Sequence, residues 1–212
     1  MIGGHDPSAE ARFLALGDSY TVGEAVAADD RWPVRLAALL RERGIALADP
    51  EIIARTGWTT DELSAAIDLA NPRGAFDLVS LLTGVNDQYR GRPVAEYCEQ
   101  FRALLARAIG FAADRADRVV VLSIPDWGVT PFAASRDAAQ IGREIDDFNR
   151  VNRDEATRAG SPYVDVTGIS RRAANEPNLV AGDGLHPSGN MYREWAQAVL
   201  PVAMTALTRA AP

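Results

Sequence analysis

Three residues, Ser19, Asp183 and His186, have the side-chain types that a serine acyl-transfer site requires. A serine hydroxyl is a weak nucleophile, so it needs a neutral imidazole to take its proton and a carboxylate to hold that imidazole in the correct tautomer. His186 is the candidate base, because the other histidine, His5, lies in a polar stretch before the first predicted strand. Asp183 comes just before His186 in the chain, close enough within one turn for its carboxylate to reach the imidazole Nδ1.

The same chemistry needs hydrogen-bond donors that point at the negatively charged oxygen of the tetrahedral intermediate. The side-chain amide of Asn86 is one candidate, and the backbone N–H groups of Ser19 and Gly57 are two more. Loss of one such donor typically raises the reaction barrier by ~3 kcal/mol. These residues would therefore form an oxyanion hole.

All of these residues follow predicted strands. Short apolar runs predict five strands, at residues 12–16, 50–55, 76–82, 118–124 and 162–166. Ser19, Gly57 and Asn86 follow the first three strands closely, and the stretch GDGLHPSG, which contains Asp183 and His186, follows the fifth at a greater distance. Ligands of open parallel sheets bind outside the carboxyl ends of the strands, so we expect these residues to meet at one edge of the sheet.

Longer helical patterns alternate with the strands. They predict helices at residues 32–43, 59–69, 93–112, 140–159 and 189–208. This alternation is typical of an α/β fold with a parallel sheet, and the length fits one domain over residues 1–212. Residues 125–139 predict a long loop, in which Trp127 and Phe132 would either line a substrate pocket or anchor the loop.

Four short sequence blocks resemble those of the SGNH hydrolases, the GDSL-type esterases and lipases. In chain order they are GDSY at 17–20, the isolated Gly57, GVND at 84–87 and DGLH at 183–186. Carried over position by position, the resemblance implies a catalytic triad of Ser19, Asp183 and His186. It also implies an oxyanion hole of Ser19, Gly57 and Asn86. The implied fold is a flavodoxin-like three-layer α/β/α sandwich, and the implied activity is that of a serine esterase or acylhydrolase without a cofactor.

Taken singly, each residue has a simpler interpretation. Ser19 could cap a helix, Gly57 could supply a turn with positive φ, and Asn86 could form an Asx-turn. Asp183 with His186 could be a structural ion pair or half of a metal site, although the chain has few further histidine or cysteine ligands to complete one. Their joint occurrence after strands favours the hydrolase, with no metal.

Two other functions would use the same fold. An acyltransferase would keep every residue of the site and pass the acyl group to an alcohol or a sugar in place of water. A flavodoxin-like binding module would instead hold a phosphate or nucleotide at its first loop, and Asp183 and His186 would then lie far from Ser19.

The composition excludes several classes of function. The formal net charge of the 212 residues is −7 and the pI is about 4.9, so no broad basic surface is available for nucleic acid or an anionic membrane. All 22 basic residues are arginines, which excludes Walker A loops and Schiff-base chemistry. The single cysteine, Cys98, excludes an intrachain disulfide. No signal peptide or membrane span is evident, so we expect a cytoplasmic enzyme with a small-molecule ester substrate.

Overall fold

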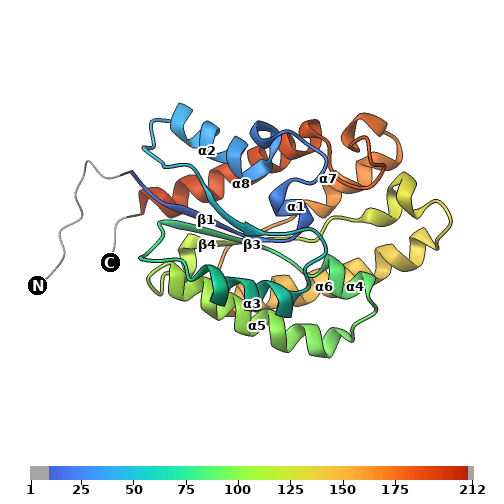
Figure 1. Cartoon of the computed structure of the whole chain (residues 1–212), viewed down its shortest axis with the longest axis horizontal. Coiled ribbons are helices and arrows are strands. Elements are labelled where there is room, and N and C mark those ends of the chain that lie inside the picture. Colours follow the sequence, from blue (N-terminus) through green and yellow to red (C-terminus); the bar gives the residue numbers. More distant parts are fainter. Residues whose placement is uncertain (1–9, 210–212) are drawn as a thin grey trace, which may run out of the picture.

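The computed structural model describes residues 10–209 and is built around a parallel sheet (Figure 1). The order of the strands across the sheet is β2-β1-β3-β4-β5, which is the flavodoxin-like order. The strands are β1 (Phe13–Gly17), β2 (Glu51–Ala54), β3 (Leu78–Leu82), β4 (Val119–Leu122) and β5 (Tyr163–Val164). Each strand overlaps one of the five predicted apolar runs, so the predicted strands are confirmed.

Five long helices cover the sheet and confirm the five predicted ones. They are α2 (Trp32–Glu42), α3 (Thr60–Ala70), α5 (Val94–Phe111), α6 (Ala138–Ala159) and α8 (Gly189–Thr208). In Figure 1, α2 and α8 lie on one face of the sheet and α3, α5 and α6 on the other. The result is the predicted three-layer α/β/α sandwich.

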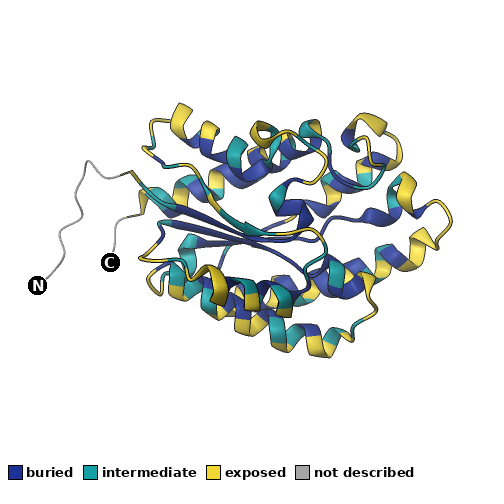
Figure 2. Ribbon diagram, in the orientation of Figure 1, coloured by how far each residue is buried: buried dark blue, intermediate teal, exposed yellow. Residues whose placement is uncertain are grey.

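The core lies between these layers. Every residue of β1, β3 and β4 is buried, and Figure 2 shows these central strands buried while the outer faces of the helices are exposed. Such continuous apolar strands are expected where helices cover both faces of a parallel sheet. The two largest fully buried side chains, Trp32 of α2 and Trp195 of α8, fill the layer above the sheet.

The segment 125–139 is more ordered than the predicted loop. It contains two short 3₁₀ helices, Trp127–Val129 and Pro131–Ala133, and its end belongs to α6. Helix α6 begins at Ala138 because the Asp137 carboxylate accepts a hydrogen bond from the Gln140 N–H and so caps the first turn. The prediction of a loop up to residue 139 was therefore wrong at its end.

Three short helices follow strands directly and lie outside the five predicted helical ranges, although the capping interpretation of Ser19 had anticipated a helix after the first strand. They are α1 (Ser19–Val22) after β1, α4 (Val85–Tyr89) after β3 and α7 (Thr167–Arg171) after β5. Two of them contain candidate site residues, since Ser19 opens α1 and Asn86 lies in α4. The carboxyl edge of the sheet is therefore helical after three of its strands.

The register of β1 brings the ends of three strands to one level. Gly17 pairs with Ala54 of β2 on one side and with Leu82 of β3 on the other. Gly17 has no room for a side chain, because a Cβ atom there would lie 2.2 Å from Thr21 Oγ1 and 2.5 Å from the Leu82 carbonyl oxygen. The close approach of α1 to β3 thus depends on glycine at this position.

We expect Gly17→Ala to lower the free energy of unfolding by about 1–3 kcal/mol, because the added methyl group would force β3 or α1 to shift. Urea unfolding followed by circular dichroism measures this change. Gly110→Ala is the matched control, since a Cβ atom there meets nothing within 4 Å and α5 gains a better helix former. Equal stability of the two variants would contradict the steric role of Gly17.

Candidate active site

Ser19 is the first residue of α1 but does not cap it. The cap is Asp18, whose Oδ1 accepts a hydrogen bond of 3.0 Å from the Tyr20 N–H. The capping interpretation of Ser19 is therefore wrong, and its hydroxyl is left for another role. Ser19 is 5% exposed, so neighbouring residues cover nearly all of its surface.

Asp183 and His186 form a close pair within one loop. The distance between Asp183 Oδ2 and His186 Nδ1 is 2.5 Å, and Asp183 Oδ1 accepts hydrogen bonds of 3.0 Å from the backbone N–H groups of Leu185 and His186. Burial raises the pKa of Asp183, but the hydrogen bonds from the His186 ring and from the two N–H groups lower it further, so the pKa lies below its usual value. The carboxylate is thus ionised and orients the imidazole as a general base requires.

The loop of His186 is fixed to its surroundings by backbone contacts. The Ala181 N–H donates to the His186 carbonyl at 2.7 Å, and the Phe132 N–H donates to the Gly184 carbonyl at 2.9 Å. The His186 ring packs against the Tyr20 ring, with 5.5 Å between ring centroids. This contact places the imidazole beside the residue that follows Ser19.

Gly57 and Asn86 present the two other predicted oxyanion donors. Gly57 has a φ of +87°, a conformation that favours glycine, and its N–H has no acceptor among residues 10–209. Asn86 Nδ2 donates to the Trp58 carbonyl at 2.9 Å, which uses one of its two amide hydrogens and leaves the second available. The Asx-turn interpretation of Asn86 is not supported, because no backbone N–H within residues 10–209 donates to its Oδ1 and the residue lies inside α4.

One cavity of about 190 Å³ brings these residues together. Of the predicted site residues, it is lined by Ser19, Gly57, Asn86, Trp127, Phe132 and His186, while Asp183 lies behind His186. No hydrogen bond joins Ser19 Oγ to His186 within the described part of the chain. Such bonds are often long in unliganded sites and shorten when substrate binds. The binding-module alternative required His186 to lie far from Ser19, and the shared cavity contradicts it.

Sequence reasoning missed five further residues of the cavity wall. They are Tyr20, Thr56, Val85, Tyr89 and Leu185. Four of them are neighbours in sequence of Ser19, Gly57, Asn86 or His186, so adjacency to the motifs could have indicated them. Tyr89 carries no such signal, because its place depends on the turn of α4.

Three aromatic rings form one wall of the cavity. Tyr89 lies 5.4 Å from Trp127 and 6.4 Å from Phe132, centroid to centroid, and Trp127 lies 6.0 Å from Phe132. The Trp127 indole N–H donates to Gln88 Oε1 at 2.8 Å, which orients the ring and satisfies its polar atom. Trp127 and Phe132 therefore both line the cavity, and their contact with substrate stays a prediction.

Two buried carboxyl groups lie directly behind the site. Asp87 is fully buried and accepts hydrogen bonds of 3.0 Å from both the N–H and the hydroxyl of Thr60, at the start of α3. Asp18 is also fully buried, and its Oδ2 atom has no partner within residues 10–209. Burial, opposed by the Tyr20 N–H and reinforced by the charge of Asp87, raises the pKa of Asp18 to about 7.

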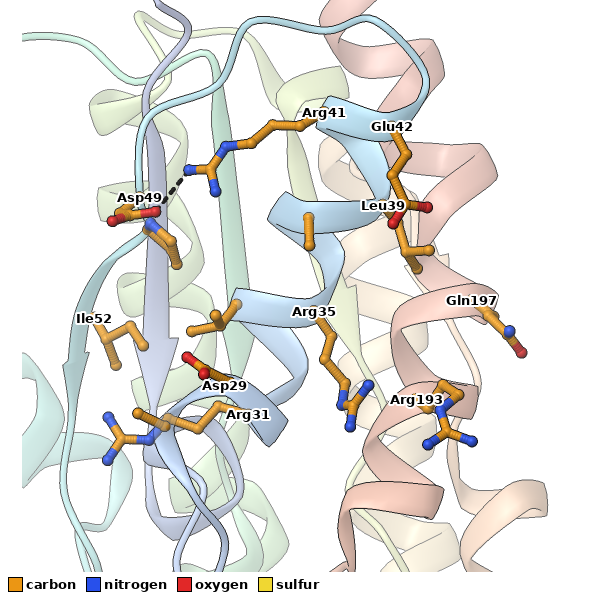
Figure 3. Close-up of a pocket in the computed structure, with 14 residues that line it drawn as sticks. Asp29, Arg31, Arg35, Leu39, Arg41, Glu42, Asp49, Ile52, Arg193 and Gln197 are labelled. Atoms are coloured by element: carbon orange, nitrogen blue, oxygen red, sulfur yellow. Dashed lines mark hydrogen bonds and ion pairs between the residues drawn. The ribbon is translucent and has the colours of Figure 1, made fainter.

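A larger groove, of about 700 Å³, runs beside α2 and is distinct from this cavity (Figure 3). None of the predicted site residues lines it. Arg35 extends into it from α2 and Arg193 from α8, and Arg41 forms an ion pair of 2.7 Å with Asp49. Arg35 is likewise paired, with Asp30. Size alone therefore does not identify the site, and the chemistry points to the smaller cavity.

Two kinds of feature are absent from residues 10–209. No group of three or more His, Cys, Asp or Glu side chains is arranged so that it could hold a metal ion. No helix in this part of the chain is both long and apolar enough to cross a bilayer. The expected cytoplasmic location stays a prediction, and His5 lies outside the described residues.

Comparison with known proteins identifies the same family that the sequence blocks resemble. The model of the GDSL-like lipase/acylhydrolase family matches residues 15–194. No curated protein sequence matches the chain.

Similar solved structures include TesA, with a TM-score of 0.74 and 19% identity over 92% of this chain and 99% of that one. A lipase/acylhydrolase from Enterococcus faecalis has a TM-score of 0.72 at 17% identity, covering 95% of this chain and 100% of the other. The acetylxylan esterase Axe2 from Geobacillus stearothermophilus has a TM-score of 0.68 at 20% identity, covering 95% and 97%. At these identities the likeness confirms the fold.

The buried Asp18 gives a prediction about pH and stability. Its pKa is about 7 in the folded chain and near the ordinary 3.8 in the unfolded one, so between these values the folded state holds the extra proton. The wild-type free energy of unfolding should therefore fall as the pH rises from about 4 to 7 and be level above. Asp18→Asn mimics the protonated acid, and its stability relative to wild type should rise over that range by up to about 4 kcal/mol.

Chemical unfolding at a series of pH values measures this difference. Asp49→Asn, which neutralises an exposed carboxylate, is the matched control and should show no such trend. A constant difference between Asp18→Asn and wild type from pH 4 to 8 would refute a protonated Asp18.

Proposed function

Because this chain belongs to the GDSL-like lipase/acylhydrolase family and is an ester-hydrolysing enzyme, we propose that it cleaves carboxylic esters through an acyl-enzyme formed on Ser19. The observation that carries this proposal is the cavity that Ser19 shares with His186, while Asp183 Oδ2 holds His186 Nδ1 at 2.5 Å from the far side. Nucleophile, base and orienting carboxylate then stand in the order that serine hydrolysis needs.

The first half of the reaction forms the acyl-enzyme. Ser19 Oγ attacks the ester carbonyl carbon while its proton passes to His186 Nε2, and the carbonyl oxygen becomes an oxyanion. Asn86 Nδ2 and the N–H groups of Gly57 and Ser19 stabilise that charge. The C–O bond to the alcohol then breaks, and the alcohol leaves with the proton that His186 returns.

The second half releases the acid. A water molecule gives a proton to His186 and attacks the acyl carbon, a second oxyanion forms in the same place, and Ser19 Oγ leaves with the proton. An alcohol in place of water would give acyl transfer by the same steps. Product analysis with and without an added alcohol distinguishes the two outcomes.

The size of the cavity supports short acyl groups as substrates. About 190 Å³ is small beside the 300–1,000 Å³ of typical ligand pockets, and its walls are mainly apolar and aromatic. Phe132 closes one side and is 45% exposed, so its ring stands between the cavity and solvent. We propose that this ring limits the length of the acyl chain.

Ser19→Ala should lower the hydrolysis of p-nitrophenyl acetate by at least about 10³-fold, because no other group can form the acyl-enzyme. Its stability should stay within about 0.5 kcal/mol of wild type, since the Ser19 hydroxyl caps no helix. Labelling with a fluorophosphonate, followed by mass spectrometry, tests the same role of Ser19, because the variant should not be labelled. Ser135→Ala, at an exposed serine, is the control and should keep both activity and labelling. Full activity of Ser19→Ala would overturn the proposed function.

Phe132→Ala should shift the preference of the enzyme toward longer acyl chains. We expect the ratio of kcat/KM for p-nitrophenyl octanoate to that for the acetate to rise about tenfold, which corresponds to the contact of one or two methylene groups. A series of p-nitrophenyl esters measures the ratio. Leu69→Ala removes an exposed apolar side chain outside the cavity and should leave the ratio unchanged. An unchanged ratio in Phe132→Ala would exclude the ring as the limit.

A further inference from the structure

Arg90, directly after α4, contacts the candidate oxyanion hole without lining the cavity. Its Nη2 donates a hydrogen bond of 2.7 Å to the carbonyl oxygen of Gly57. The same guanidinium pairs with both carboxylate oxygens of Glu62, in α3, at 3.2 Å each. Arg90 thus links the end of α4 to the loop of Gly57 and to the first turn of α3.

Glu62 completes this link from the other side. Its Oε2 accepts a hydrogen bond of 2.9 Å from the Thr59 N–H, two residues after Gly57. The Thr59 N–H and the Arg90 guanidinium both lower the pKa of Glu62, so the carboxylate is ionised and neutralises Arg90. The positive charge is therefore already compensated before any substrate binds.

Gly57 has few other restraints on its backbone. It lies in a turn closed by a long hydrogen bond of 3.3 Å from the Trp58 N–H to the Arg55 carbonyl. It has no side chain, and a Cβ atom at this position would meet nothing within 4 Å, so packing does not fix its φ and ψ angles. Hydrogen bonds hold its neighbours: the Thr56 hydroxyl donates to Glu24, and the Trp58 carbonyl accepts from Asn86 Nδ2 at 2.9 Å. On Gly57 itself, the hydrogen bond from Arg90 is the contact that holds the carbonyl.

We propose that Arg90 is a positioning residue, which fixes the Gly57 backbone so that its N–H points at the oxyanion. This inference rests on the proposed function, in which the Gly57 N–H is an oxyanion donor. The position of Arg90 directly after GVND could also suggest that it recognises an anionic substrate. It is paired with Glu62 and is not part of the cavity wall, so this role does not fit its place. Arg92 is likewise engaged, with Asp61.

The expected effect is on kcat. Loss of a whole oxyanion donor costs about 10²–10³ in kcat, so a donor that remains but is free to turn away should cost less, about tenfold. The oxyanion exists only after attack, so substrate binding does not use this contact and KM should change by less than about twofold. We therefore expect Arg90→Gln to lower kcat about tenfold at nearly constant KM. Arg90→Lys, which keeps one charged donor, should recover part of the loss.

Arg107→Gln is the matched control. Arg107 also contacts a backbone carbonyl and a carboxylate of α3, with bonds of 2.9 Å to the Ser64 carbonyl and an ion pair of 2.5 Å with Asp68. It does not contact the loop of Gly57. Loss of an arginine that only stabilises α3 should therefore change the melting temperature but not kcat.

The experiment measures kcat and KM for p-nitrophenyl acetate, per active site titrated with a fluorophosphonate, for wild type and for the Arg90 and Arg107 variants. The rate of Ser19→Ala is measured per mole of protein, because this variant has no serine to titrate. A selective fall of kcat in Arg90→Gln, with partial recovery in Arg90→Lys, supports the inference. The inference is overturned if kcat of Arg90→Gln equals that of Arg107→Gln, or if KM rises at constant kcat. In either case an inactive Ser19→Ala still supports the proposed function. An active Ser19→Ala overturns both.

Discussion

The parallel pairing of β1 with both β2 and β3 is the constraint on which the site depends. Because Gly17 lies level with Ala54 and Leu82, the chain leaves three strands at one height along the edge of the sheet. Ser19, Gly57 and Asn86 each follow within a few residues of those ends. Their proximity therefore does not depend on the conformation of long loops. It follows from the hydrogen-bonded register of three neighbouring strands.

Buried carboxyl groups then fix the turns that the register brings together. Asp18 caps α1, and Asp87 holds the first turn of α3 through Thr60, although burial raises the pKa of both groups. Unpaired burial of a charge is costly, so Asp18 is best accommodated when protonated. The buried Asp18 therefore lowers stability at neutral pH but fixes the position of Tyr20, the residue next to Ser19. Both acids lie at the candidate site and not in the apolar core, which is consistent with such a role.

The features that could be predicted from the sequence are those that a local pattern of residues determines. The strands appear as apolar runs and α3 begins at a threonine followed by acidic residues, so fold class, strand positions and long helices could be foreseen. The helices α1, α4 and α7 are too short to show a period and are shaped by their contacts. The bond from Arg90 to Gly57 spans 33 positions of sequence, and Tyr89 reaches the cavity only through the turn of α4. Such features follow from tertiary structure, and the sequence suggested Arg90 only as a contact for an anionic substrate group or as an exposed side chain.

The candidate catalytic residues thus fall into two groups with different supports. Asp183 and His186 are held within one loop by contacts of that loop's own backbone, so their pairing would survive small shifts of the sheet. Ser19, Gly57 and Asn86 depend on the sheet and on side chains such as Arg90. The two groups meet where Tyr20 packs on His186 and where Phe132 is tied to Gly184. Reactivity of Ser19 then depends on these contacts, because they help to set the distance between the nucleophile and a base that is already oriented.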